Sequence, residues 1–159
     1  MSIRLLVGYG SHTGQAESIA KQIGERAERR GVRVTVDTLN QLETQLQLSP
    51  SSFLVVVISS TGDGDPPENA SRFIRRLSRK DAPPDQLAGV HYALLGLGDS
   101  NFSTYQGVPI KVDKILASLG ATREMERGEA DDQVGLELVV EPWIDRLFAE
   151  CLAKRYTVD

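Results

Sequence analysis

The sequence is poor in the residue types that build covalent cross-links and metal centres. It contains one cysteine, Cys151, so an internal disulfide is excluded. Because Cys151 occupies an apolar position in a helical pattern, we expect a buried thiol. The two histidines, His12 and His91, have neither triad partners nor metal-ligand spacing. We therefore predict a protein with no metal site and no catalytic triad.

The sequence also lacks an apolar run of about 18 residues, and Met1 leads into a strand pattern rather than into a targeting segment. These absences predict a cytoplasmic protein without a membrane partner. Basic residues are outnumbered by acidic ones, 18 to 22, which gives a net charge of −4 and a pI near 5.2. This balance argues against nucleic acid and anionic membranes as partners, and it suits a basic protein partner.

What the 159 residues do contain is an alternation of apolar runs and amphipathic stretches, which is typical of βαβ units around a parallel sheet. We predict one domain, residues 1–159, of the α/β class. Continuous apolar runs mark buried strands, whereas an alternating run marks a half-exposed edge strand. The buried strands are expected near residues 5–7, 53–58 and 92–95, the edge strand near 32–37, and a weaker fifth strand near 121–125.

Helical spacing of apolar residues predicts helices around residues 16–27, 70–77, 112–119 and 134–152. The third of these stops at Gly120, a residue type that often ends helices. Pro142 lies inside the last pattern and is expected to end or kink one segment there, because proline lacks the N–H of the helical hydrogen bond.

Three unusual loops follow predicted strands, at residues 11–16, 59–67 and 96–102. Ligands of open parallel sheets bind outside the carboxyl ends of the strands, so we expect these loops to form one site. The first loop, SHTGQA, precedes a helix and can hold a phosphate through its hydroxyls and backbone N–H groups. The alternative is that Ser11 or Thr13 only caps this helix.

Two other phosphate-binding patterns compete for the first loop. A nucleoside triphosphatase loop is excluded because Gly14 is not followed by lysine and a hydroxyl residue. A dinucleotide fingerprint stays open, since Gly8, Gly10 and Gly14 give a spacing only one residue too long and Asp37 stands where a ribose ligand is expected. The hydroxyls of the loop favour a terminal phosphate monoester instead.

The second and third loops carry further signals. Gly62 and Gly64 allow backbone conformations or a close ligand approach, although the prolines beside them also suit ordinary turns before a helix. Phe102 follows a polar stretch and is either a ring available for stacking or a packed core residue.

Taken in order, the segments SHTGQAE, STGDGDPPENA and LLGLGDSNF resemble the flavodoxin-like FMN domain of the diflavin reductases. The segment ADDQVGLELVVEPW, residues 130–143, is most similar to the members that reactivate methionine synthase. The resemblance covers essentially the whole chain. It implies a flavodoxin-like three-layer sandwich, a five-stranded parallel sheet of order 2-1-3-4-5, and FMN across its carboxyl edge.

The resemblance also implies the FMN-binding residues, carried over by matching position. Six residues wrap the phosphate, and five run along the edge of the isoalloxazine ring. A further six come from the third loop and the residues just after it, with Phe102 stacking on the ring, and an aspartate from the loop after the fifth strand closes the site. In chain order these are Ser11, His12, Thr13, Gly14, Gln15, Ala16, Ser60, Thr61, Gly62, Asp63, Gly64, Leu97, Gly98, Asp99, Phe102, Tyr105, Gln106, and Asp131 or Asp132.

Two details of the second loop bear on the redox chemistry. The resemblance implies that the carbonyl of Gly62 turns toward N5 of one-electron-reduced flavin. Thr61 stands where many relatives have a second aromatic, so we expect one ring face to lack an aromatic cover. Acidic residues lie on or beside the ligand loops, and their charge is expected to make reduced FMN a stronger donor and to steer a basic partner. They are Asp63, Asp65, Glu68, Asp99, Glu129, Asp131 and Asp132, with Arg127 as the adjacent cation.

The predicted function is one-electron transfer by a monomer. By resemblance, electrons arrive from NADPH through an FAD module and leave for cobalamin-dependent methionine synthase. The chain has no such module, so alone it is expected to lack NADPH oxidase activity, and it is either a domain of a longer reductase or a free protein.

Four further functions stay open at this point. They are a stand-alone flavodoxin, an FMN domain of another diflavin reductase, a dinucleotide-dependent dehydrogenase domain, and a receiver module. The dehydrogenase would need a catalytic base and a substrate domain, for which the sequence offers neither candidates nor length. The receiver module is disfavoured because Ser59 and Ser60 stand where a receiver carries its phosphoacceptor acid.

Overall fold

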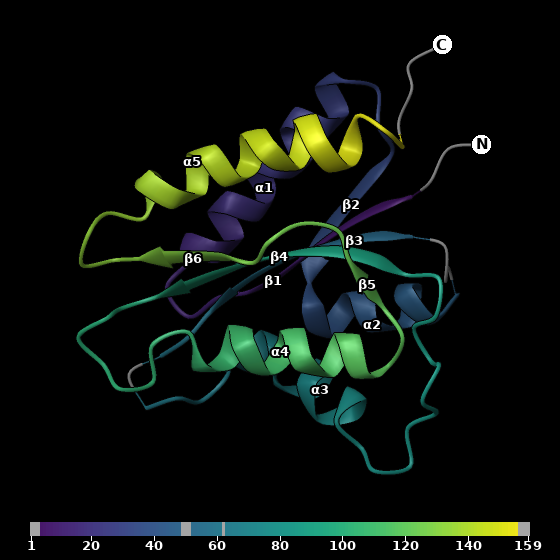
Figure 1. Cartoon of the computed structure of the whole chain (residues 1–159), viewed down its shortest axis with the longest axis horizontal. Coiled ribbons are helices and arrows are strands. Elements are labelled where there is room, and N and C mark those ends of the chain that lie inside the picture. Colours follow the sequence, from purple (N-terminus) through teal and green to yellow (C-terminus); the bar gives the residue numbers. More distant parts are fainter. Residues whose placement is uncertain (1–3, 49–51, 62, 156–159) are drawn as a thin grey trace.

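The computed structural model describes residues 4–48, 52–61 and 63–155, and it places a twisted parallel sheet between two layers of helices (Figure 1). The strand order is β2-β1-β3-β4-β5, with β6 also paired to β4. This confirms the predicted α/β class and sheet order. The strands are β1 Leu5–Gly10, β2 Val34–Thr38, β3 Phe53–Ser59, β4 His91–Gly98, β5 Thr122–Arg123 and β6 Gly128–Asp131.

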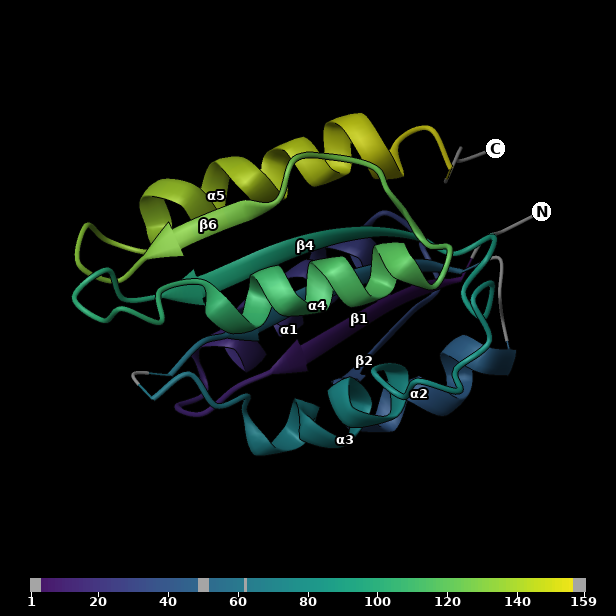
Figure 2. The ribbon, with the colours of Figure 1, turned by 60° about the horizontal axis from the view of Figure 1, so that its bottom comes forward.

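Helices α1 and α5 cover one face of the sheet, and α2, α3 and α4 cover the other (Figures 1 and 2). Each face has its own hydrophobic core, because alternate side chains of the central strands point to opposite faces. The helices are α1 Gln15–Arg29, α2 Leu39–Leu48, α3 Glu68–Leu77, α4 Gly107–Ser118 and α5 Glu137–Arg146, the last continued by a π-helical segment, Leu147–Leu152.

The apolar runs occupy the centre of the sheet, as predicted. In β3, Phe53 through Ile58 are all completely buried, whereas every residue of the edge strand β2 is only half-buried. Burial of each large aliphatic side chain contributes roughly 1.5–3 kcal/mol, so the two cores provide most of the driving force for folding. Cys151 lies in the core between the sheet and helices α1 and α5 and is buried, as expected.

Strand β1 is longer than its apolar run, because Gly8 and Gly10 belong to the strand rather than to the loop. A Cβ atom on Gly8 would lie 2.5 Å from Leu39 of α2, and one on Gly10 would lie 2.8 Å from the Cβ of Ala70 in α3. These two glycines therefore let helices approach the sheet closely, and they are not part of a dinucleotide fingerprint loop.

The prediction of a fifth strand near residues 121–125 is confirmed in place, but the strand is shorter than predicted and a sixth strand follows it. The structure has a short β5 at Thr122–Arg123, and the main pairing with β4 is made by β6, where Leu95 to Gly98 pair with Gly128 to Asp131. Between the two pieces the side chain of Met125 enters the core. The fifth position of the sheet is thus occupied by an interrupted strand, and its second half ends at the predicted ligand loops.

The last helix also differs from its prediction. It begins at Glu137 rather than at Val134, and Pro142 lies within α5 without ending it. Proline removes one helical N–H, but its natural acceptor belongs to Leu138, which is 61% exposed, so the freed carbonyl can be satisfied by water. The change to π-helical geometry comes later, after Arg146.

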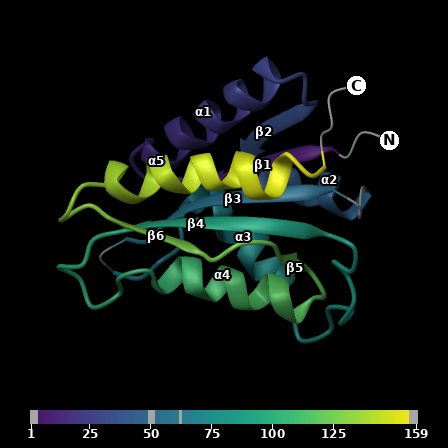
Figure 3. The ribbon, with the colours of Figure 1, turned by 45° about the horizontal axis from the view of Figure 1, so that its top comes forward.

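The loops that follow β1, β3, β4 and β6 all lie at one end of the sheet, on the left in Figure 3. Parallel strands bring their carboxyl ends to one edge, so segments far apart in the sequence meet there. In the part of the chain that the structure describes, no helix is both long and apolar enough to cross a membrane.

Candidate functional site

A hollow of about 230 Å³ opens at this edge of the sheet, between the loops that follow β1, β3, β4 and β6. Its wall combines hydroxyl and amide side chains with two leucines and two aspartates. The lining residues are His12, Thr13, Gln15, Ser59, Ser60, Thr61, Leu97, Gly98, Asp99, Asp132 and Leu136. No lysine or arginine is among the described residues of this wall, so an anion bound against it would be held mainly by dipoles.

The first loop presents the start of α1 to the hollow. Gly14 is the N-cap with φ 94°, a left-handed conformation that favours glycine, and no side chain among the described residues caps the helix. The hydroxyl of Ser11 accepts a hydrogen bond from the N–H of Gly14 itself, at 2.9 Å. The alternative that Ser11 or Thr13 serves as the N-cap is therefore not observed, and the first-turn N–H groups of α1 are available to an anion.

The second loop is shaped by Asp63. Its carboxylate accepts hydrogen bonds from the hydroxyl of Thr61 and, at 3.0 Å, from the N–H of Asp65. The bond from Thr61, helped by that from Asp65, lowers the pKa of Asp63. Gly64 has φ 83°, which again favours glycine. Gly62, whose carbonyl the resemblance to the diflavin reductases implies to turn toward the flavin, lies outside the described residues.

The third loop places its aromatic residue on the surface. Phe102 is 48% exposed and does not line the hollow. Tyr105 is half-buried, and burial raises the pKa of its phenol, with Asp131 and Glu129 adding to the effect. Gln106 is buried with φ 58°, and its side chain donates to the carbonyls of Gly96, at 3.2 Å, and Ala130, at 3.1 Å. Gln106 thus joins β4 to β6 from behind the hollow.

The two aspartates of the fifth loop have different positions, which the sequence alone could not separate. Asp131 accepts from the N–H groups of Ser100 and Gln133, both at 3.0 Å, and so ties the third loop to the fifth. Hydrogen bonds from the side chain and backbone of Ser100, with the amide of Gln133, lower the pKa of Asp131. Asp132 lines the hollow, and its main-chain N–H donates to Gly98 at 2.8 Å.

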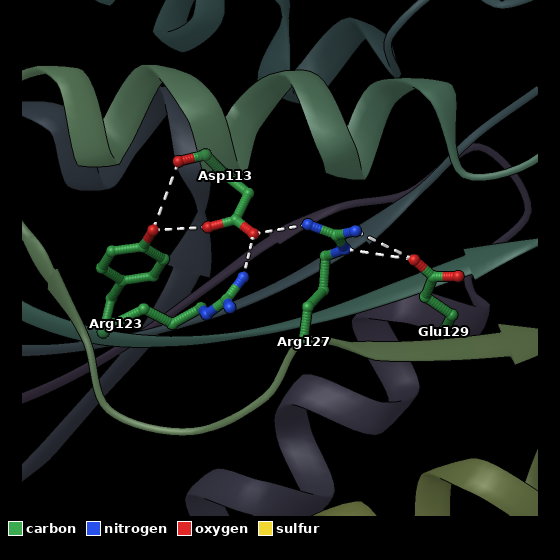
Figure 4. A network of polar contacts seen from close by, with 5 residues as sticks. Asp113, Arg123, Arg127 and Glu129 are labelled. Carbon is green, nitrogen blue, oxygen red and sulfur yellow. Dashed lines mark hydrogen bonds and ion pairs between the residues drawn. The ribbon is translucent and has the colours of Figure 1, made fainter.

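Glu129 differs from the other acidic residues of the edge because its charge is neutralised. Nη2 of Arg127 lies 3.0 Å from Oε2 of Glu129. Arg127 also forms an ion pair with the buried Asp113 of α4, and Arg123 forms a second ion pair with Asp113 (Figure 4). The interrupted strand is therefore fixed to α4 by a network of charges. The negative field at the hollow comes from the aspartates rather than from Glu129.

The structure brings together nine of the predicted site residues around the hollow, and adds two. Ser59 belongs to the predicted second loop but not to the predicted FMN-binding residues, and Leu136 belongs to neither. Leu136 was assigned to the last helix, and its apolar character gave no reason to choose it over its neighbours. Several predicted residues lie beside or behind the hollow rather than on its wall: Ser11, Gly14, Ala16, Asp63, Gly64, Phe102, Tyr105, Gln106 and Asp131.

The rival dinucleotide site depends on Asp37, and this residue is engaged elsewhere. Its carboxylate accepts the N–H of the next residue, Thr38, at 2.8 Å, and it does not line the hollow. Together with the strand position of Gly8 and Gly10, this argues against a dinucleotide site, and the loop before α1 is a short loop that carries hydroxyl side chains. A family model described as flavodoxin matches residues 7–143. The chain belongs to the flavodoxin family. FMN is its cofactor.

The curated relatives of this flavodoxin-family chain are much longer proteins. It is 50% identical to methionine synthase reductase of Caenorhabditis elegans over 96% of the chain, but this match covers 22% of that relative. It is 42% identical to NADPH-dependent diflavin oxidoreductase 1 of Danio rerio over 88% of the chain and 24% of the relative. The chain therefore spans about a fifth to a quarter of the length of these proteins.

Solved structures agree on the fold. A mutant flavodoxin from Pseudomonas aeruginosa aligns with a TM-score of 0.78 at 22% identity, covering 93% of this chain and 98% of the other. A flavodoxin 2 from Bacillus cereus aligns with a TM-score of 0.72 at 22% identity, covering 96% and 99%.

The residues around the hollow fit FMN. Its phosphate suits the uncapped start of α1 with the hydroxyl of Thr13, because N–H groups at a helix N-terminus bind anions without a cation. Its ring suits the apolar side chains of Leu97 and Leu136. When bound, FMN supplies the electron-transfer chemistry. The chain contributes the anion site, the apolar wall and, through Asp99 and Asp132, negative charge at the rim.

Proposed function

We propose that this domain is the FMN-bearing electron carrier of a diflavin reductase system. The observation that carries the proposal is the identity of 50% with a methionine synthase reductase, over a length that includes every loop of the hollow. Electrons would come from an FAD module that oxidises NADPH, located in the same longer chain or in a separate protein. The proposed acceptor is methionine synthase, whose inactive cobalamin would be reduced. We further propose a single domain over residues 1–159 that acts as a cytoplasmic monomer.

The surface around the hollow supports exchange with a protein partner. Among the described residues, the large apolar side chains that are exposed are Phe102, Val134 and Leu138, at 48%, 66% and 61%. All three belong to the third and fifth loops or to the start of α5, at the ligand edge of the sheet. Exposed apolar residues with a charged rim are typical of protein interfaces, and the aspartates of this rim would select a basic partner.

The test uses the domain loaded with FMN, reduced chemically and mixed without oxygen with methionine synthase in its inactive cobalamin state. The expected result is recovery of methionine synthase turnover faster than with the same concentration of free reduced FMN, and slower at high ionic strength because charge steers the encounter. Cytochrome c serves as a generic one-electron acceptor in parallel. Reduction of cytochrome c without recovery of methionine synthase would favour a stand-alone flavodoxin or another diflavin reductase. Transfer to neither acceptor would reject the carrier function.

A further inference from the structure

The first loop, residues 11–16, forms a hydrogen bond with the side chain of Asn69 in α3, which does not line the hollow. Ser11 is the first residue after β1, and its N–H donates to Oδ1 of Asn69 at 2.9 Å, across 58 residues of sequence. Neither residue belongs to the wall of the hollow. The N–H of Ser11 is therefore directed to α3, and it is not among the donors that face an anion.

Close packing places Asn69 at this position. The first turn of α3 lies against the end of β1, where a Cβ on Gly10 would come within 2.8 Å of the Cβ of Ala70. Because Gly10 has no side chain and Ala70 has a single methyl group, the first turn of the helix approaches the strand closely. Asn69, the residue before Ala70, then reaches the amide directly after Gly10.

The hydrogen bond from Ser11 continues into the loop. The hydroxyl of Ser11 accepts the N–H of Gly14, the N-cap of α1, at 2.9 Å. Asn69 is thus connected through Ser11 to the residue that sets the position of the first-turn N–H groups of α1. Since α3 also follows the second loop, the connection joins the two loops expected to hold the phosphate and the ring.

We propose that Asn69 is a positioning residue for the FMN phosphate: it fixes Ser11, and through Ser11 the loop and the start of α1, before the cofactor binds. This inference rests on the assignment of residues 11–16 to the phosphate. A loop that is already ordered loses less conformational entropy on binding, so its affinity for the phosphate is higher. Loss of Asn69 should therefore weaken binding of the phosphate and leave the contacts of the ring in place.

The chain offers a matched control in a second asparagine, Asn40, at the start of α2. Its side chain donates to the carbonyl of Glu68 at 3.0 Å and accepts the N–H of Phe73 at 2.8 Å. Asn40 therefore holds the same helix, α3, through the same kind of hydrogen bond. No bond of its side chain to residues 11–16 is found among the described residues.

The experiment compares the affinities for FMN and for riboflavin, which has the same ring without the phosphate, in wild type, Asn69→Ala, Asn40→Ala and Thr13→Ala. Asn40→Ala should lower the stability to urea while keeping the ratio of the two affinities within about twofold of wild type.

The outcomes separate this proposal from the assignment of the loop. Thr13 lines the hollow, so Thr13→Ala should also lower FMN affinity selectively; if it does not, residues 11–16 are not the phosphate site. If Thr13→Ala lowers the ratio of FMN affinity to riboflavin affinity and Asn69→Ala does not, the proposed role of Asn69 is rejected, and the assignment of residues 11–16 to the phosphate is kept. Equal losses for FMN and riboflavin in Asn69→Ala, or a ratio that falls as much in Asn40→Ala, would reduce Asn69 to a general structural contact.

Hydrogen exchange of the Ser11 amide, measured without cofactor, gives a second readout. Asn69→Asp keeps an oxygen that can accept this N–H, whereas Asn69→Ala removes it. We expect slow exchange in wild type and in Asn69→Asp and faster exchange in Asn69→Ala. The same exchange rate in all three would contradict the proposed positioning of the loop.

Discussion

Two aspartates, Asp113 in α4 and Asp131 at the end of β6, each join segments that are distant in sequence, and they do so with different partners. Asp113 is buried and accepts from the guanidinium groups of Arg123 and Arg127 and from the phenol of Tyr92 (Figure 4). Asp131 accepts from backbone N–H groups. The two ends of the interrupted fifth strand are therefore fixed by charge on one side and by neutral dipoles on the other.

The difference has an electrostatic consequence. Burial alone would raise the pKa of Asp113, but the hydrogen bonds from Tyr92 and Arg127 and the charge of Arg123 outweigh it, so the pKa is lowered. Asp113 keeps its charge, and the two negative charges of Asp113 and Glu129 balance the two positive charges of Arg123 and Arg127. Asp131 also keeps its charge, but the hydrogen bonds that fix it come from neutral groups of the described residues. Asp113 thus fixes the strand through ion pairs, whereas the charge of Asp131 is not paired with a cation among the described residues and adds to the negative potential at the ligand edge.

The largest effect is expected from Asp113→Ala. Removing the shared carboxylate takes away the acceptor of Arg123, whereas Arg127 keeps Glu129 and the phenol of Tyr92 keeps the main-chain carbonyl of residue 113. Breaking a buried ion pair costs about 3–5 kcal/mol. Because Arg123 is 40% exposed and can turn to water, we expect a loss near the lower end, about 3 kcal/mol, in the free energy of unfolding measured in urea. FMN affinity of the remaining folded protein should change little. A loss of affinity larger than the loss of stability would show that the two regions are not separate.

Much of this arrangement could be predicted from the sequence, and the remainder depends on tertiary contacts. The apolar runs located the central strands because burial on both faces leaves a continuous pattern, as in Phe53 to Ile58. The segment Gly128–Asp131 is polar and short, and it becomes a strand only because Leu95 to Gly98 offer it backbone partners and Ala130 enters the core.

The candidate site divides in the same way. Motifs within one loop, such as the hydroxyl residues before α1, could be recognised in the sequence because their residues are neighbours along the chain. The distinction between Asp131 and Asp132 was not visible, since it depends on the amide of Ser100, which is 31 residues from Asp131. The bond from Ser11 to Asn69 spans an even longer stretch of sequence, so no local pattern could predict it.

A smaller effect, confined to the ligand edge, is expected from Phe102→Ala. Its ring is 48% exposed, so removing it should leave the free energy of unfolding almost unchanged. If the ring stacks on the flavin, its loss should cost about 1 kcal/mol of FMN binding, or roughly a fivefold rise in Kd, measured by flavin fluorescence. Exposed Leu138, changed to Ala, serves as a control with similar exposure. Unaltered affinity would remove Phe102 from the site and would limit the ligand edge to the residues of the hollow.

The smallest effect concerns the charge of Asp131. Its folded-state pKa is lowered, so its contribution to stability is present above the unfolded pKa, about 4, and is lost as the pH falls through the folded value. In Asp131→Asn the side-chain oxygen can still accept from Ser100 and Gln133, but nothing titrates. We therefore expect the variant to be slightly less stable than wild type at about pH 7, and this difference to disappear under acidic conditions. Urea unfolding at both pH values measures it. Asp132→Asn controls for loss of charge, because Asp132 joins the loops through its main-chain N–H. A difference that persists in acid would mean that the shape of the carboxylate, rather than its charge, holds the third and fifth loops together.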